Sequence, residues 1–564
     1  MITEFIDFLD KIIWSPPLVF GLLITGLIFS LITRFAQVRQ FKEMIRLLFK
    51  GEKSPQGISS FQAISLSLAG RVGTGNIVGV SAAIFIGGPG AVFWMWVTAL
   101  LGASTAFVES TLGQIYKQKE NGEYRGGPAY YIENGIGGKF GKIFALIFAI
   151  VTIISIGLLM PGVQSNAIAT SLHSAFSVPK WAVTIFLVIL LSLIIFGGIK
   201  RIASMATAIV PFMAIAYILL AVIVIFLNIE EVPALFALIF KSALGLQSTF
   251  GGIIGAMIEI GVKRGLYSNE AGQGTGPHAA SAAEVSHPAK QGLVQAFSAY
   301  IDTIFVCTAT ALIILISGTY NTTDGTENAQ GQPNLIEDNG VYVLNADGSK
   351  DFSGTAMYVQ SGIDKAFQGD SYQFDPNFAG FGSYFIAIAL FFFAFTTILA
   401  YSYITETNIA YLTRNMSTKK SNFYITLTRF LLIFATAYGT IKTADAAWAM
   451  GDVGVGMMAW LNIIAIWILC KPAFRALKDF ENQKKSKGSG SLAVYKPTQQ
   501  DAPNAYFWFN REKIMKMLIN KNNKYSEQNF IILFYSMNYI TKPMPSTTSR
   551  NMGFNLLIVN NHRY

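Results

Sequence analysis

The sequence predicts an all-α protein that crosses a membrane many times. Of its 564 residues, 52% are hydrophobic and only 13% are charged, and the mean hydropathy is +0.45. One soluble core could not bury that much apolar surface, so lipid is the predicted solvent. Runs of about 20 apolar residues, the length that crosses a hydrocarbon layer of about 30 Å, follow one another along the chain.

Eleven apolar runs have the length of membrane spans. They are 17–37, 61–86, 90–116, 142–172, 180–197, 203–227, 247–266, 291–317, 382–412, 423–441 and 445–470. Alternate loops carry Lys and Arg, and such loops are typically cytoplasmic. The N-terminus is therefore predicted outside and the C-terminus in the cytoplasm. The basic residues assigned to these loops are Arg39, Lys42, Arg46, Lys117, Lys119, Arg125, Lys200, Arg201, Lys263, Arg264, Lys290, Arg414, Lys419 and Lys420, followed by the stretch from Lys471.

Three segments are predicted to lie outside the membrane domain, which covers residues 1–480. Residues 228–246 have the pattern of a short amphipathic helix on the outer face. The polar residues 318–381 are expected to form an external excursion with little core of its own. Residues 481–564 are rich in Lys, Ser and Gly at their start and predict a cytoplasmic polar tail without fixed structure.

The second span is interrupted by glycines and polar residues between Ala69 and Asn76. At mid-membrane depth such residues are costly in a regular helix, which predicts that the helix unwinds here. Unwound backbone is tolerated in a membrane where it lines a polar cavity, as in the binding sites of transporters. Close packing between helices is the alternative, but it does not account for Thr74 and Asn76.

The span 247–266 repeats this pattern, with glycines at 251, 252 and 255 and an internal Glu259, and continues into Asn269 and Glu270. Interruptions at corresponding places in two halves indicate inverted repeats with a binding site between them. The repeats are predicted at 61–227 and 247–470, and 17–37 is left as an extra helix.

Polar residues inside other spans supply further candidates. The adjacent Thr396 and Thr397, with carbonyl groups of the broken helix, form an oxygen-only set that suits a hard cation. For each single Thr, a hydrogen bond to its own helix is an equally good interpretation. Arg71 is predicted to pair with Glu259 or another carboxylate, because an unpaired cation at this depth is costly. Glu109, Asp302, Asp445 and Asp452 are expected to have interfacial or paired structural roles.

Several function classes are disfavoured. The net charge of +10 is spread over short loops and does not predict nucleic-acid binding. The spans contain no phosphate loop, no metal-ligand cluster and no nucleophile beside an oriented base, so an enzyme is not expected. A channel or a membrane-bound sensor stays open as a second class. No cofactor is expected, membrane lipid surrounds the chain, and no pattern specifies an oligomeric state.

The chain resembles the alanine or glycine:cation symporter family from about residue 15 to about residue 480. Four segments carry the resemblance: VGTGNI at 72–77, GGPGAVFWMW at 87–96, GGPAYYI at 126–132 and GLYSNEAG at 265–272. The resemblance implies a LeuT-like fold of two inverted five-helix repeats after one extra helix, in a bacterial inner membrane. It also implies uptake of a small neutral amino acid, alanine or glycine, coupled to Na⁺, with H⁺ used by some relatives.

The resemblance also implies roles for particular residues. The carboxylate of the substrate would meet Thr74, Gly75 and Asn76, and further lining residues would be Gln164, Thr397 and Tyr401. The cation would bind between the backbone at Ala69 and Val72 and the hydroxyl groups of Thr396 and Thr397. Residues implicated in gating or coupling are Arg71, Glu259, Asn269 and Glu270. Tyr401 stands where the family usually has Trp, which changes the volume and polarity of the expected pocket.

Overall fold

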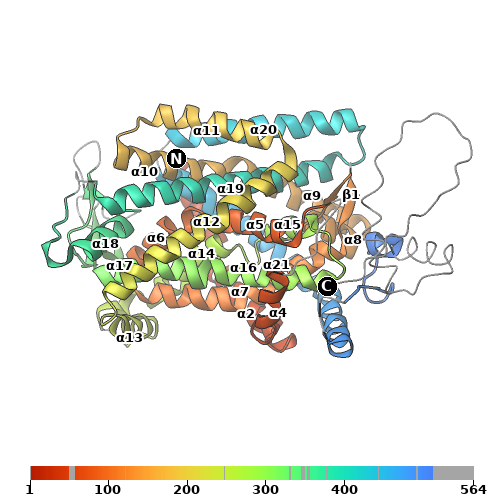
Figure 1. Ribbon diagram of the computed structural model, residues 1–564, viewed down its shortest axis with the longest axis horizontal. Coiled ribbons are helices and arrows are strands. Elements are labelled where there is room, and N and C mark those ends of the chain that lie inside the picture. The colour runs from red at the N-terminus through yellow and green to blue at the C-terminus, as the bar shows by residue number, and fades with distance from the viewer. Residues whose placement is uncertain are drawn as a thin grey trace, which may run out of the picture. The chain divides into compact units, whose positions relative to one another are not determined.

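The protein is a bundle of long helices with a few short hairpins (Figure 1). The computed structural model describes residues 2–49, 57–120, 122–246, 248–328, 332–344, 350–351, 356–375, 379–441, 444–488, 490 and 493–511. The helices are α1 Ile2–Ile13, α2 Pro16–Ile32, α3 Ala36–Arg39, α4 Phe41–Phe49, α5 Ser60–Arg71, α6 Val78–Gly87, α7 Gly90–Ile115, α8 Pro128–Ile136, α9 Gly138–Ile154, α10 Met160–Phe176, α11 Lys180–Ile195, α12 Gly198–Leu227, α13 Val232–Ala243, α14 Ile254–Asn269, α15 Gly276–Ala282, α16 Pro288–Ala299, α17 Thr308–Ser317, α18 Met357–Gln368, α19 Phe381–Thr413, α20 Thr418–Ile441 and α21 Ala444–Lys487.

Short helical turns and hairpins complete the description. The turns are η1 Thr74–Asn76, η3 Ser248–Ile253 and η5 Gly369–Ser371, of the 3-10 type, and η2 Ser155–Leu159 and η4 Tyr300–Cys307, of the π type. Antiparallel hairpins join β1 Gln118–Glu120 to β2 Glu123–Arg125, β3 Thr322–Glu327 to β4 Pro333–Glu337, and β5 Val343–Leu344 to β6 Lys350–Asp351.

Many of these helices have the length and composition of membrane spans. In the described residues, 7 helical stretches are long and apolar enough to cross a membrane: 90–115, 138–176, 198–227, 288–317, 381–413, 418–441 and 448–486. Shorter apolar helices are α2, α6, α11 and α13. Every run predicted as a span contains helix, and the prediction of a polytopic helical membrane protein is confirmed.

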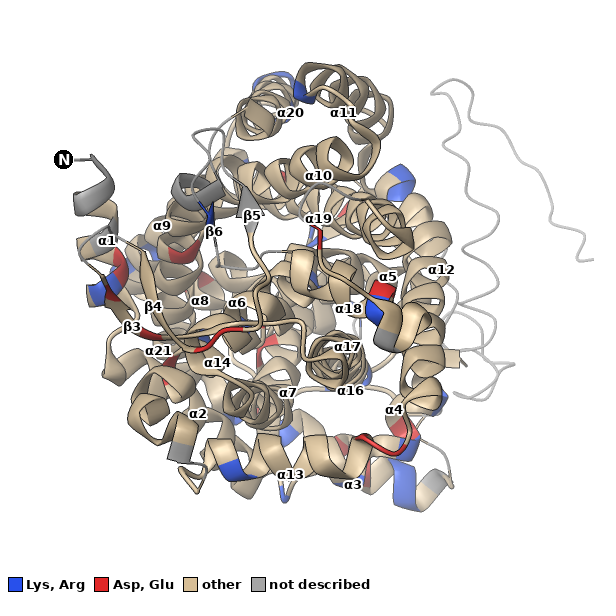
Figure 2. Ribbon diagram, turned by 90° about the vertical axis from the view of Figure 1, so that its left-hand side faces the viewer, with Lys and Arg blue, Asp and Glu red and all other residues tan. Residues whose placement is uncertain are grey.

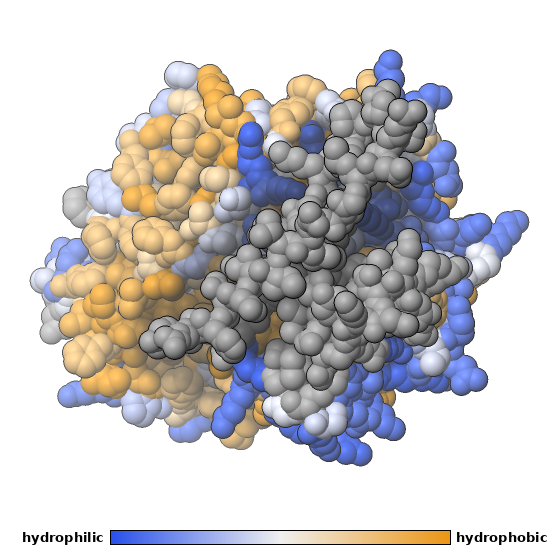
Figure 3. All heavy atoms as spheres, turned by 45° about the vertical axis from the view of Figure 1, so that its right-hand side comes forward, coloured by the Kyte–Doolittle hydropathy of each residue, from blue (hydrophilic) through white to orange (hydrophobic). Residues whose placement is uncertain are grey.

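The surface of the bundle is apolar where lipid would surround it. Large side chains on α11, α12 and α20 point outward, among them Trp181, Phe226 and Phe434, which are 66%, 76% and 69% exposed. Most of the helical ribbon carries no Lys, Arg, Asp or Glu (Figure 2). On the face drawn in Figure 3, hydrophobic residues cover the left-hand part and hydrophilic residues gather at the right-hand end. This pattern fits helices that satisfy their own backbone groups in hydrocarbon.

The first predicted interruption is confirmed. Helix α5 starts at a capping box in which Ser59 and Gln62 exchange hydrogen bonds, and it ends at Arg71. The turn η1 follows, and α6 then continues in the same run of sequence. The glycines at 73 and 75 lower the cost of leaving the helical conformation.

The second interruption lies later than predicted. Helix α14 runs unbroken past Gly255 and Glu259, because single glycines cost a helix only about 1 kcal/mol each. The chain leaves the helix at Glu270, and Gly272 and Gly274 follow with φ of +99° and +91°. Helix α15 then begins at Gly276. The break is therefore built by the segment 270–275.

Two basic residues assigned to a cytoplasmic loop lie inside α14 instead. Lys263 and Arg264 are 8% and 7% exposed and pair with the carboxylates of Asp10 and Asp452. Their charges are neutralised within the protein, so they do not mark a loop.

The segments outside the spans differ in part from the predictions. The helix predicted in 228–246 is present as α13. The excursion 318–381 includes α18, whose buried side chains Tyr358, Val359 and Ile363 belong to an element that packs against α17 and α19. The excursion thus shares the core of the bundle.

The predicted unstructured tail is corrected over its first part. Helix α21 continues to Lys487, and Trp508 is 2% exposed and donates a 2.9 Å hydrogen bond from Nε1 to the carbonyl oxygen of Gln114. The aromatic rings of Trp508 and Tyr495 pack on each other and give this polar stretch enough apolar surface to pack against the bundle. Residues 512–564 lie outside the described residues.

Candidate functional site

The break after α5 frees two backbone carbonyl groups. In a continuous helix the carbonyl of Ala69 would accept from the N–H of Gly73, but that N–H donates to Oδ1 of Asn76 at 2.8 Å. The N–H of Asn76 likewise turns to the carbonyl of Gly73, and the carbonyl of Val72 is released. Oγ1 of Thr397 on α19 lies 2.8 Å from the carbonyl oxygen of Ala69 and 3.5 Å from that of Val72. Three oxygen atoms thus converge here.

Gln164 on α10 reaches the same break from another side. Its Oε1 accepts a 3.2 Å hydrogen bond from the backbone N–H of Thr74. A Cβ atom added to Gly73 would lie 2.6 Å from Oγ1 of Thr397 and 3.0 Å from Oε1 of Gln164. Only glycine leaves room for both side chains. The structure therefore brings Thr74, Gln164 and Thr397 together, as the resemblance implied.

A hydrogen-bonded carboxylate ties the first break to the second interrupted helix. Asp302 on η4 accepts from Nδ2 of Asn76 on Oδ1 at 2.7 Å. Its Oδ2 accepts from the hydroxyl groups of Ser268 on α14 and Thr303, each at 2.7 Å. Asp302 is completely buried and has the structural role predicted for it. Cys307 lies at the same junction, with Sγ 3.3 Å from Nδ2 of Asn76.

Aromatic side chains cover the break. A Cβ atom on Gly75 would lie 3.1 Å from Cδ1 of Tyr267, so this ring packs on the turn η1. Tyr267 packs in turn against Trp448 on α21, with ring centroids 5.0 Å apart. Tyr401 on α19 is buried, and Glu270 and Tyr267 lie near its hydroxyl group. The predicted lining residue Tyr401 therefore lies near the second break.

Thr396 does not join this cluster. Its hydroxyl group donates within α19, to the carbonyl oxygens of Phe392 and Phe393 at 3.0 Å, and faces Sδ of Met213 on α12. Adjacent residues of a helix point about 100° apart, so Thr396 and Thr397 cannot face the same partner. The cation ligand predicted at Thr396 is thus not supported, and the alternative of a bond to its own helix holds there. Thr397 makes such a bond as well, at 3.0 Å to the carbonyl oxygen of Phe393, in addition to its contact with Ala69.

Arg71 is predicted to pair with Glu259 or another carboxylate, and the choice of Glu259 is wrong. Glu259 is exposed on α14, whereas Arg71 is buried and donates from Nη1 to Ser298 and, at 3.0 Å, to the carbonyl oxygen of Gln295. The carboxylates that interact with Arg71 are those of Glu270, Glu109 and Asp302. Spacing along the sequence cannot predict these neighbours, because they come from α5, α7, η4 and the segment after α14.

The other two residues predicted for gating or coupling lie at the second break. Oδ1 of Asn269 accepts from the N–H of Ala271 at 3.0 Å, which holds the chain as it leaves α14. Glu270 accepts from the hydroxyl group of Thr275 at 2.8 Å. A Cβ atom on Gly70 would lie 3.4 Å from Oε2 of Glu270, so this carboxylate packs directly against α5.

An ion pair closes one side of the site. Arg264 on α14 donates to both carboxylate oxygens of Asp452 on α21, at 3.0 and 2.8 Å. The guanidinium group also lies 5.0 Å from the ring of Trp448 and 5.6 Å from that of Tyr267. Such a bidentate, stacked arginine holds two helices in one geometry. Sequence reasoning expected a pair at Asp452 but did not identify this partner.

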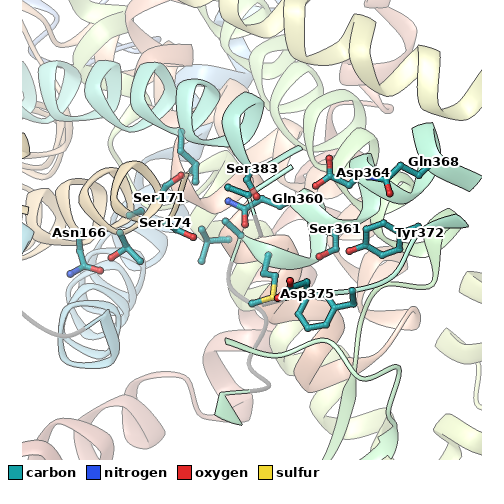
Figure 4. Close-up of a pocket in the computed structure, with 18 of the residues that line it drawn as sticks. Asn166, Ser171, Ser174, Gln360, Ser361, Asp364, Gln368, Tyr372, Asp375 and Ser383 are labelled. Carbon is teal, nitrogen blue, oxygen red and sulfur yellow. The ribbon is translucent and has the colours of Figure 1, made fainter. Parts of the chain in front are cut away.

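A pocket of about 210 Å³ lies on the same side (Figure 4). Residues of α10, α18, α19 and the segment 372–375 form its polar lining, and Val78 and Trp448 connect it to the broken helix. Burial raises the pKa of Asp364 above its ordinary value, and the hydrogen bond from the N–H of Gly382 opposes that rise. The polar residues that Figure 4 labels are Asn166, Ser171, Ser174, Gln360, Ser361, Asp364, Gln368, Tyr372, Asp375 and Ser383.

Ion pairs hold the helices together at the opposite end, near β1 in Figure 1. Glu406 on α19 accepts from Arg125 on β2 at 3.0 Å and from Arg429 on α20 at 2.7 Å. Arg414 and Glu133 form a third pair at 2.6 Å. Ion pairs therefore lie on both sides of the polar groups around the break. The pocket stops at Val78 and Trp448 and is not lined by Thr74, Gln164 or Thr397.

Long apolar helices that break around buried, converging oxygen and amide groups are typical of polytopic membrane transport proteins. The model of the sodium:alanine symporter family matches residues 1–339 and 354–493. The chain belongs to that family. Membership confirms the resemblance stated above and assigns the chain to a membrane.

Several curated relatives cover nearly the whole chain. The chain is 54% identical over 90% of its length to a putative sodium/proton-dependent alanine carrier protein of Bacillus subtilis (strain 168), of which it covers 97%. It is 47% identical over 83% of its length to a sodium/proton-dependent alanine carrier protein of Bacillus sp. (strain PS3), with 98% of that protein covered. It is 38% identical over 86% of its length to a probable sodium/glutamine symporter of Bacillus subtilis (strain 168), with 92% covered.

These relatives are carriers and a symporter, which confirms that the chain is not an enzyme. Among solved structures, a variant of a manganese transporter from Eremococcus coleocola has a TM-score of 0.41 and 14% identity, over 84% of this chain and 93% of that one. That score is too low to assign the fold.

Proposed function

We propose that the protein is a secondary active transporter that couples inward movement of Na⁺ to uptake of a small neutral amino acid, alanine or glycine. The observation that carries this proposal is the convergence of Thr397, Gln164 and the freed backbone of 69–74 at one break in one helix. The names of two relatives, sodium/proton-dependent alanine carriers, support the choice of solute and ion.

The cation would bind between the carbonyl oxygens of Ala69 and Val72 and Oγ1 of Thr397. These atoms are uncharged oxygens, and such a set suits a hard monovalent cation. The hydroxyl group of Thr397 donates to Ala69 without the ion, and in the bound state it would turn its lone pairs toward the ion instead. Binding would then draw α19 and the end of α5 together.

The amino acid would bind beside the same break. Its carboxylate would meet backbone N–H groups of Thr74 and Gly75 at the start of the second half-helix, where the helix dipole favours an anion. Asn76, Gln164 and Tyr401 would complete the pocket. The close packing of Gly75 against Tyr267 favours a solute with a small side chain.

The proposed architecture is a LeuT-like pair of inverted five-helix repeats, at 61–227 and 247–470, that follows the extra helix 17–37. Two interrupted helices in corresponding positions, α5–α6 and α14–α15, support it. With eleven spans and the N-terminus outside, the pocket of Figure 4 would open outward and the pairs of Glu406 would face the cytoplasm. The proposed location is a bacterial inner membrane.

Transport would proceed by alternating access. Na⁺ would bind first, order the broken helix and raise the affinity for the amino acid. By linkage the amino acid then strengthens cation binding by the same factor. The Arg264–Asp452 pair and the Glu406 pairs would open in turn.

The test is uptake of radiolabelled alanine into proteoliposomes under an inward Na⁺ gradient, with a K⁺-only control. Glycine, serine, leucine and glutamine serve as competitors. Concentrative uptake that requires Na⁺ and is blocked by glycine but not by leucine is the expected result. Strong competition by glutamine would favour the solute named for the third relative.

Proton coupling is the second candidate, because two relatives are named as sodium/proton-dependent. Uptake under a proton gradient alone would support it. A channel would instead pass current without a solute gradient, and a sensor would bind the amino acid without moving it. Absence of uptake of any small amino acid under either gradient would reject the proposed function.

A further inference from the structure

A cluster of charged side chains lies next to the proposed binding site and is not used by it. Arg71 ends α5, Glu109 lies on α7, Glu270 follows α14 and Asp302 lies on η4. Each of the four is at most 3% exposed. Three carboxylates thus surround one guanidinium group in the interior of the protein.

The three carboxylates are not equally stabilised. Asp302 accepts the three hydrogen bonds described above, and Glu270 accepts one from Thr275. Oε2 of Glu109 accepts from Nδ2 of Asn462 at 2.8 Å, and the backbone of Gly272 also faces this carboxylate. Oε1 of Glu109 has no hydrogen-bond partner among the described residues.

The free oxygen of Glu109 faces a free donor of Arg71. Nε and Nη2 of Arg71 likewise have no hydrogen-bond partner in the described part of the chain. A Cβ atom on Gly276 would lie 2.9 Å from Nη2 of Arg71 and 3.8 Å from Oε1 of Glu109. The absent side chain of Gly276 therefore leaves a gap that both groups line. Such unpaired buried groups are costly unless a further partner completes them.

Charge balance identifies that partner. Arg71 supplies one positive charge against three buried carboxylates, which leaves two negative charges. Three hydrogen bonds stabilise the charge of Asp302, so a proton or a cation has to neutralise the other, on Glu109 or Glu270. The groups facing Glu109 are Arg71 from α5, Glu270 from the second break and Tyr131 from α8. Asp302 acts on the same Arg71. Oε1 of Glu109, which lines the gap, is a fully buried carboxylate oxygen without a hydrogen-bond partner among the described residues.

We infer that Glu109 is a proton-binding site of this carrier and that Arg71 couples its protonation to the broken helix; this inference rests on the proposed function. When Oε1 of Glu109 binds a proton, Arg71 interacts with Glu270. When the proton leaves, the anionic Glu109 attracts Nη2 of Arg71 across the gap. In each transport cycle Glu109 binds one proton and then releases it.

The position of Arg71 explains how protonation of Glu109 would affect the proposed cation site. Arg71 directly precedes Val72, whose carbonyl oxygen belongs to the proposed cation site. A shift of the guanidinium group toward Glu109 therefore pulls on the freed backbone itself. Arg71 is a positioning residue in this scheme, because it acts through the backbone and touches no solute.

The experiment compares wild type, Glu109→Gln and the matched control Glu230→Gln, whose carboxylate is exposed outside the bundle. Each is reconstituted in proteoliposomes with a pH-sensitive dye inside, and alanine is added in Na⁺-containing and Na⁺-free buffer. Alanine counterflow, which needs no net proton movement, is measured in parallel.

Alanine is expected to acidify the interior with wild type and with Glu230→Gln. With Glu109→Gln we expect at least about tenfold less acidification, alanine uptake independent of external pH, and persisting counterflow. Because Glu109→Gln also removes a buried charge, Glu109→Asp is the second variant, and its carboxylate should keep acidification with an altered pH profile.

Three results would overturn the inference. The first is acidification by Glu109→Gln at the wild-type rate. The second is wild-type alanine uptake driven by Na⁺ without any acidification, which leaves the proposed function intact. The third is loss of Na⁺ dependence in Glu109→Gln with acidification retained, which makes the residue a cation ligand. Failure of the wild type to transport any amino acid would reject the proposed function itself.

Discussion

The side-chain hydroxyl group of Thr397 lies 2.8 Å from the carbonyl oxygen of Ala69, although the two residues are 328 positions apart in the chain. This contact joins α19 to the end of the first interrupted helix. It places the proposed cation site at a junction that only the folded chain creates, and it leads to the first prediction.

Thr397→Val keeps the shape of the side chain and removes the hydroxyl oxygen. The Na⁺ concentration for half-maximal alanine uptake is expected to rise roughly ten- to a hundredfold, because a hydrogen bond or ligand to a charged group contributes about 1.5–3 kcal/mol. Thr396→Val is the matched control, since Thr396 faces Met213. Equal effects of the two variants would move the cation site away from Thr397.

Gly73→Ala tests the crowding at the break. The added Cβ atom would lie 2.6 Å from Oγ1 of Thr397, which has to shift, so alanine uptake is expected to fall by about a hundredfold. Gly79→Ala is the control on the same broken helix, because the nearest atom to its added Cβ lies at 3.8 Å. Comparable uptake by the two variants would contradict the geometry at Gly73.

Asp452→Asn removes the charge that neutralises Arg264. Because the substitution leaves the buried Arg264 without its carboxylate, it is expected to lower the free energy of unfolding by about 3–5 kcal/mol. The readout is the thermal unfolding midpoint of the purified protein in detergent. Asp10→Asn, at a more exposed pair with Lys263, should cost about 1 kcal/mol or less. A midpoint of Asp452→Asn equal to that of Asp10→Asn would refute the prediction.

Glu406→Gln breaks the two ion pairs with Arg125 and Arg429. The end of the bundle that they close is expected to open more often. If the free-energy difference between the closed and open states falls by about 1.4 kcal/mol, the population of the open state rises tenfold. Cys307, which is 2% exposed beside Asn76, serves as the reporter in a Cys470→Ser background. A membrane-permeant maleimide should label it about tenfold faster.

Glu123→Gln is the control for this experiment. Glu123 is a partly exposed second partner of Arg125, and its loss leaves both pairs of Glu406 in place. Its labelling rate should match that of the Cys470→Ser parent. Unchanged labelling in Glu406→Gln would show that these pairs do not limit access to Cys307.

Trp508→Ala tests whether the segment 493–511 belongs to the folded domain. Trp508 is buried against Gln114 and Tyr495, and truncating such a tryptophan typically costs about 3–5 kcal/mol. The unfolding midpoint in detergent should drop accordingly. Tyr506→Ala, which is 54% exposed, should leave the midpoint nearly unchanged. A midpoint of Trp508→Ala close to wild type would restore the prediction of an unstructured tail.

Much of the fold was predictable because its signals are local. An apolar run long enough to cross a membrane identifies a helix, and the cluster of glycines between Ala69 and Asn76 identifies its interruption. The second break was predicted too early for the same reason, since isolated glycines resemble a break in sequence. Only the run from Glu270 to Gly274 adopts the positive φ angles that end the helix.

The site was predictable in its parts and not in its contacts. Polar residues inside spans, such as Gln164 and Thr397, stood out against an apolar background and are brought together as expected. Asp302 also stood out, but two of its three donors, Asn76 and Ser268, come from other elements, 226 and 34 positions away in the sequence. The partner of Arg264 was missed because both residues look like ordinary charges near span ends.

The sequence by itself determined that this chain is a polytopic helical membrane protein with a broken helix, and its motifs determined the family. The tertiary structure decided that Thr397, not Thr396, faces the break, and that Arg71 lies near Glu109 and Glu270 instead of Glu259. The physical reason lies in the solvent: in lipid a helix is apolar on nearly every side, so hydrophobic periodicity does not show which face a polar residue occupies. That choice is made when the helices pack.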